Sequence, residues 1–89
     1  MAKNEEFMPS ELEARIERRL YERYGEILTI ENLVEVLRYE TNGALMQALY
    51  RGTFLIPLLR WPNRRGYFAR VADVAAHLAR CETVVATVE

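Results

Sequence analysis

The chain has 89 residues, of which 51% are hydrophobic and 28% are charged, and its formal net charge is -1. This length allows one small domain, and no run of residues is long and apolar enough to span a bilayer. A single cysteine, Cys81, excludes an internal disulfide, and one cysteine with one histidine cannot build a zinc site of the usual spacing. Because the first residues lack a secretory signal, we expect a cytoplasmic protein.

The small net charge hides a separation of charge along the chain. Residues 1–40 contain six basic and ten acidic side chains, whereas residues 41–72 contain five arginines and no acidic residue. Because charges in physiological salt act over about 8 Å, such a basic block can bind a polyanion although the whole protein is slightly acidic. The block therefore suggests phosphate as a ligand, and a merely solvated basic surface is the plainer alternative.

The first predicted element is an amphipathic helix that begins at Ser10 and ends near Gly25. Ser10 followed by Glu13 has the pattern of a capping box, and residues 1–9 are expected to form a flexible acidic lead. Apolar side chains then recur every four residues, which predicts a face directed at a core or at another copy. These side chains are Leu12, Ile16, Leu20 and Tyr24.

Two short helices joined by a tight turn are predicted next. Thr29 is a suitable N-cap for the first of them, which is expected to end at about Arg38 or Tyr39. The segment Thr41-Asn42-Gly43 breaks the chain and starts the second helix, which Gly52 closes. This order is a helix-turn-helix pattern.

Beyond Gly52 the residues favour strands. Segments 53–59 and 66–71 are rich in β-branched and aromatic side chains, with turn formers and arginines between them, so a β-hairpin with a basic tip is predicted. A last helix is expected from about Ala72 to Arg80. It completes a domain over residues 10–81, which is followed by a tail, 82–89, that either pairs as a strand or frays.

The sequence predicts the surroundings of three further side chains. We assign Phe68 to the core, because aromatic residues on a two-stranded ribbon usually pack onto the helices beneath it. Trp61 either packs in the same way or stacks on a nucleic acid. Cys81 is expected to be a buried or half-buried residue at the end of the last helix.

Five segments between residues 28 and 78 carry a resemblance to a known family. They are Leu28-Thr29-Ile30-Glu31-Asn32-Leu33, Leu49-Tyr50-Arg51-Gly52, Ile56-Pro57-Leu58-Leu59-Arg60, Arg64-Arg65-Gly66-Tyr67-Phe68 and Val71-Ala72-Asp73-Val74-Ala75-Ala76-His77-Leu78. Their order resembles that of small winged helix-turn-helix proteins of the excisionase and MerR type, including phage and plasmid regulators, and the third is similar to a strand of pyocin-activator-like regulators. The resemblance implies an α+β fold, with helices and a two-stranded β-hairpin wing. It also implies that the second motif helix enters the major groove of double-stranded DNA while the wing contacts phosphates or the minor groove.

The second motif helix, residues 43–50, is apolar for a helix that reads bases. If Leu45, Ala48 and Leu49 face the core, Gln47 and Arg51 are left with strong base-edge chemistry, Gln for adenine and Arg for guanine. Affinity is then expected to depend on phosphate contacts and DNA shape. The candidate DNA-binding residues are Thr41, Asn42, Gln47, Tyr50, Arg51, Arg60, Asn63, Arg64, Arg65 and Arg70.

These patterns predict a protein that binds double-stranded DNA as a transcriptional regulator or as a recombination directionality factor of a mobile element. Since the sequence contains no phosphate-binding glycine loop and no nucleophile elbow, we expect neither an enzyme nor a cofactor. We expect a homodimer through the tail, the first helix or both, with its motif helices about 34 Å apart on DNA.

A protein-interaction module or inhibitor that uses helix 43–50 and the tail is the alternative function. Exposure of the apolar residues of that helix would favour this alternative. An arrangement in which Gln47 and Arg51 are outermost on a basic surface would favour DNA binding.

Overall fold

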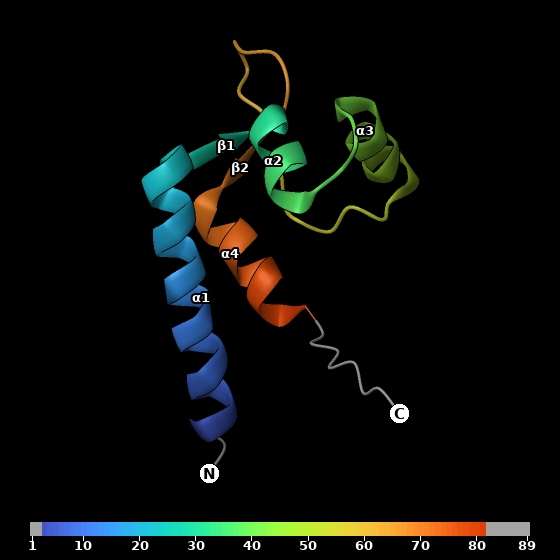
Figure 1. Ribbon diagram of the computed structural model, residues 1–89. Helices are drawn as coiled ribbons and strands as arrows, with labels where there is room; N and C mark the ends of the chain where they lie inside the picture. Colours follow the sequence, from blue (N-terminus) through green and yellow to red (C-terminus); the bar gives the residue numbers. More distant parts are fainter. Residues whose placement is uncertain (1–2, 82–89) are drawn as a thin grey trace.

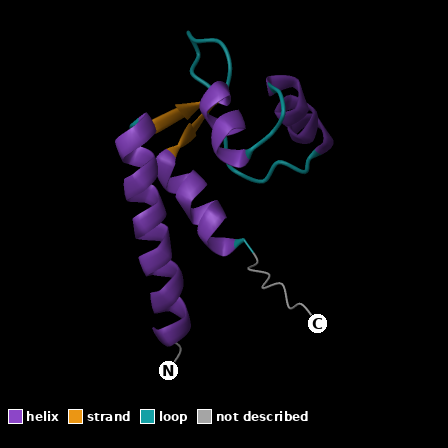
Figure 2. Cartoon of the chain, in the orientation of Figure 1, coloured by secondary structure: helices purple, strands orange, loops and turns teal. Residues whose placement is uncertain are grey.

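The fold is α+β, as predicted. The structure, a computed structural model, describes the backbone of residues 3–81 and the side chains of residues 11–81. Over these residues it contains four helices and a two-stranded antiparallel sheet (Figures 1 and 2). The elements in chain order are α1 (Lys3–Tyr24), β1 (Ile27–Thr29), α2 (Ile30–Leu37), α3 (Asn42–Arg51), β2 (Phe68–Arg70) and α4 (Val71–Arg80).

The sheet joins two distant parts of the chain. β1 pairs with β2 in antiparallel register, with Leu28 opposite Ala69, and both of these residues are fully buried. The Val71 N–H donates to the Glu26 carbonyl at 2.8 Å, which adds a further hydrogen bond beside the ladder. Because the strands are antiparallel, the start of α2 lies beside the chain that enters β2, and the start of α4 lies beside the chain that enters β1.

The two short helices α2 and α3 begin and end close to where the sequence predicts. The Thr29 side chain accepts a hydrogen bond from the Asn32 N–H at 3.2 Å, and the Asn32 side chain accepts one from the Thr29 N–H at 3.0 Å. The Thr41 hydroxyl oxygen caps α3 by accepting from the Ala44 N–H at 3.0 Å. Gly52 ends α3 with a φ of 81°, a left-handed conformation that glycine adopts without steric cost.

The predicted start of the first helix at Ser10 is wrong. α1 begins at Lys3 and continues through Pro9. Strong helix formers on both sides of Pro9 favour a continuous helix. The proline costs this helix one backbone hydrogen bond, because it has no N–H to donate to the preceding turn. The predicted end is confirmed, because α1 stops at Tyr24 and Gly25 has a φ of 86°.

The predicted hairpin is reduced to a single pair of residues. Leu59 and Phe68 exchange two backbone hydrogen bonds, of 2.6 and 2.9 Å, while the rest of segment 53–59 forms no strand. The main partner of β2 is β1, which the sequence patterns did not predict. Segment 53–59 is unsuited to pairing because Pro57 lacks an N–H and the Thr53 N–H is used by the Ala48 carbonyl, at 2.9 Å.

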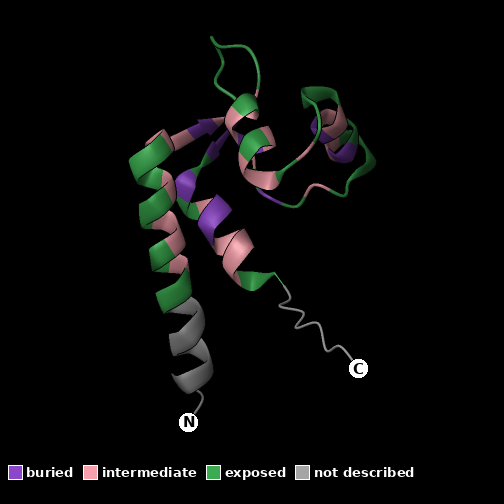
Figure 3. Ribbon diagram, in the orientation of Figure 1, coloured by how far each residue is buried: buried purple, intermediate pink, exposed green. Residues whose placement is uncertain are grey.

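The core lies where the sheet, α2, α3 and α4 meet, and α1 packs on α4 (Figures 1 and 3). Phe68 is buried, as predicted, whereas Cys81 is exposed at the end of α4, so its predicted burial is wrong. Across residues 3–81, none of the helices has the length and apolar character needed to cross a membrane. The core cluster consists of Leu28, Leu33, Leu45, Ile56, Ala69, Val71 and Val74.

Candidate nucleic-acid interface

The basic segment predicted as a hairpin tip is an exposed loop, residues 60–67, which we call the arginine loop. The Leu59–Phe68 pair closes its base. It projects from the end of the molecule away from the N-terminus of α1, and α3 lies near the same end (Figure 1). Most of the loop is exposed to solvent (Figure 3). The chain therefore presents two separate segments of the predicted site, the arginine loop and α3, at one end.

Aromatic rings support one arginine of this loop. Trp61 packs edge-on against Phe68, with 4.7 Å between ring centroids, and Phe68 itself is only 8% exposed. The guanidinium carbon of Arg64 lies 5.1 Å from the Trp61 ring centroid and 4.8 Å from that of Phe68. These cation–π contacts restrain a side chain that is otherwise free in water. The position of Arg64 is thus linked through Phe68 to the core, and Trp61 packs on the protein.

The other polar residues of the loop are less restrained. The guanidinium carbon of Arg60 lies 5.5 Å from the Tyr67 ring centroid, and Asn63 and Arg65 are exposed. Among the described side chains, salt bridges join Arg23 to Glu35 and, separately, Arg70 to Asp73; none involves a residue of the arginine loop. Its arginines are therefore not held in a salt bridge with a described carboxylate.

α3 presents a polar outer face. Leu45 and Ala48 are buried and Leu49 is half-buried, as predicted, and Met46 is also half-buried. Tyr50 is 76% exposed. The exposed candidate residues of this helix and its cap are Thr41, Asn42, Gln47, Tyr50 and Arg51.

Arg70 does not belong to this group. It lies at the end of β2 that leads into α4, whereas the arginine loop joins the other end of the strand. Its guanidinium lies 3.5 Å from the Asp73 carboxylate. Because Asp73 offsets its charge and the sheet separates it from the loop, Arg70 is a poor candidate for a phosphate contact.

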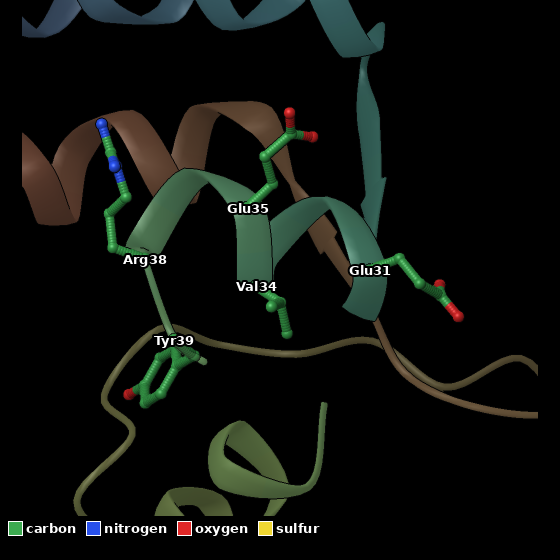
Figure 4. A pocket seen from close by; sticks show the side chains of 5 residues that line it. All are labelled: Glu31, Val34, Glu35, Arg38 and Tyr39. Atoms are coloured by element: carbon green, nitrogen blue, oxygen red, sulfur yellow. The ribbon is translucent and has the colours of Figure 1, made fainter. Parts of the chain in front are cut away.

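Two carboxylates of α2 lie at the border of the surface formed by the arginine loop and α3. Glu31 and Glu35 line a shallow groove of about 600 Å³ (Figure 4), and Glu31 also lines a smaller one beside Arg65. Hydrogen bonds from the Tyr24 hydroxyl and from the Arg23 guanidinium favour the ionised form of Glu35 and lower the pKa of this carboxyl group. The two carboxylates limit the surface that a polyanion can approach.

The sequence predicted the exposed arginines of the arginine loop and of α3, but two features of the site were missed. The support of Arg64 by Trp61 and Phe68 requires a loop conformation that spacing does not specify. The position of Glu31 beside Arg65 requires β1–β2 pairing, which brings the start of α2 against the end of the arginine loop. A signal for the first feature existed in the sequence, because Trp61 and Phe68 flank Arg64 at short range.

Comparison of the chain with protein-family models, with curated protein sequences and with solved structures found no match in any of the three.

Proposed function

We propose that the protein binds double-stranded DNA through the arginine loop and the exposed face of α3, as a winged helix-turn-helix protein similar to the excisionase and MerR type. The observation that carries this proposal is the supported arginine: Arg64 lies over Trp61 and Phe68, in a loop with no acidic residue. A preorganised, exposed guanidinium suits a phosphate or a narrow groove, because binding removes little side-chain freedom.

In this proposal the two segments have different tasks. α3 lies in the major groove, where Gln47 and Arg51 meet base edges, and the arginine loop contacts the sugar-phosphate backbone or the adjacent minor groove. The capped α2–turn–α3 unit and the loop beside it are compatible with this arrangement. A transcriptional regulator and a recombination directionality factor would both use it.

The protein-interaction alternative receives less support. It requires apolar residues of α3 at the surface, but Leu45 and Ala48 are buried and the outer face carries Gln47 and Arg51. Its second element, the tail over residues 83–88, lies outside the described residues.

Replacement of both Arg64 and Arg65 by alanine tests the proposal. We expect weaker binding to every duplex, because phosphate contacts carry no sequence information. The slope of log affinity against log salt concentration should become shallower by about 0.9 for each phosphate that the variant no longer neutralises. The measurement is fluorescence anisotropy with labelled random and selected duplexes over a series of salt concentrations.

The matched control replaces Arg15 and Arg19 by alanine, since both are exposed on α1, away from the arginine loop. This variant loses the same charge and should bind almost as well as the parent protein. Unchanged affinity in the Arg64→Ala, Arg65→Ala variant, with an intact fold by circular dichroism, would contradict the proposal.

A further inference from the structure

α1 has an outward face that the proposed DNA site does not use. Leu20 and Tyr24 of the predicted apolar stripe pack against the core, whereas Leu12 at its other end is 40% exposed. On a different face of the helix, a shallow hollow of about 340 Å³ is lined by Ala14, Glu17, Arg18 and Tyr21. Tyr21 is 55% exposed and supplies the largest side chain of this hollow.

The order of side chains along this face is complementary to itself. Residues three and four apart share one face of a helix, so the four positions form one row. The row begins with the smallest side chain, Ala14, and ends with the largest, Tyr21, while the middle pair carries opposite charges. A two-fold axis that passes between Glu17 and Arg18 makes the helices of two copies antiparallel. Each Tyr21 then meets the Ala14 of the other copy, and each Glu17 meets an Arg18.

We propose that two copies of the protein associate through antiparallel α1 helices, with Tyr21 of each copy over Ala14 of the other and Glu17 paired with Arg18. Charge complementarity and size complementarity both select a second copy as the occupant of this face. The proposal concerns the free protein and does not require DNA.

The position of α1 leaves the proposed DNA site accessible in such a dimer. α1 packs on α4, whereas α3 packs on α2 and lies across the molecule from α1 (Figure 1). Two copies joined at α1 therefore expose two α3 helices and two arginine loops. The row spans only about 10 Å of helix at 1.5 Å per residue, so the contact is small, and an association in the micromolar range is expected.

Charge reversal with rescue tests this register. In the dimer, Arg18→Glu places four carboxylates at the centre of the contact and Glu17→Arg places four guanidinium groups there. Each single variant should dissociate at about tenfold higher concentration, and the Glu17→Arg, Arg18→Glu double variant should recover most of the association, because opposite charges again face each other. The measurement is sedimentation of the full chain, without DNA, from 1 to 100 µM.

Arg19→Glu is the matched control, since it makes the same charge change on an exposed residue one position away from the row. Tyr21→Ala adds a variant with no charge change, and it should also weaken association. Circular dichroism checks that every variant keeps its helix content.

A parent protein that is monomeric at 100 µM would overturn the proposal. So would single variants that behave like Arg19→Glu, or a double variant that fails to recover. Since these experiments contain no DNA, failure here is distinguishable from failure of the Arg64→Ala, Arg65→Ala test.

Discussion

At the scale of single residues, two neighbouring arginines have different surroundings. Arg64 lies over the rings of Trp61 and Phe68, whereas Arg65 is exposed and lines the small groove that contains Glu31. A guanidinium held on aromatic rings loses less conformational freedom when it binds a phosphate, and a nearby carboxylate competes for the guanidinium of its neighbour. Arg64 is therefore expected to contribute more to binding than Arg65.

A double-mutant cycle on Trp61 and Arg64 tests this difference. Trp61→Ala removes one wall of the support and should weaken DNA binding several-fold, corresponding to about 1 kcal/mol. In an Arg64→Ala background the same substitution should have little effect, since the supported group is already absent. Anisotropy titrations on one duplex give the four affinities. Additive losses would mean instead that Trp61 contacts the DNA independently of Arg64.

At the scale of elements, local signals predicted the helices and the strand β2, but they did not predict β1 or its pairing with β2. Thr29, Thr41 and Gly52 act as caps because their hydrogen bonds and backbone angles involve residues only a few positions away. β1 was missed because three residues immediately before a helix give no alternating pattern. Its partner β2 lies far along the chain, and no local feature specifies that pairing.

The same distinction applies to the candidate site. The exposed face of α3 was predicted by helical periodicity, and burial of Leu45 and Ala48 confirms the interpretation. Arg70 was included only because it belongs to the acid-free segment. Its salt bridge with Asp73 arises at the junction of β2 and α4, a geometry that charge counting along the sequence does not contain.

Gln47→Ala tests whether α3 reads bases. If the Gln47 amide contacts an adenine edge, the substitution should cost about 1 to 3 kcal/mol on a selected duplex and much less on random DNA. Selection of bound fragments from random duplexes supplies the preferred site, and competition titrations compare the two. Equal losses on both DNAs would show that Gln47 only positions the helix or that recognition depends on DNA shape.

At the scale of the whole molecule, the charges are separated in space as well as in sequence. The arginine loop and α3 form the basic end, while the carboxylates of α2 begin directly beside it. Glu35 is balanced by Arg23, with 2.9 Å between guanidinium nitrogen and carboxylate oxygen. Glu31 forms no salt bridge within the described residues, so it opposes a polyanion that covers both the arginine loop and α3.

Glu31→Gln should therefore strengthen DNA binding while it slightly weakens the fold. Removing one negative charge beside the proposed phosphate contacts is expected to raise affinity about twofold to fivefold at low salt, and the gain should shrink as salt screens the repulsion. The same carboxylate lies in the first turn of α2, where it interacts favourably with the helix dipole, so unfolding should become easier by about 0.5 kcal/mol. Glu22→Gln on α1 is the matched control and should leave affinity unchanged. If Glu31→Gln lowers affinity, or raises it equally at all salt concentrations, DNA does not cover the surface between the arginine loop and α3.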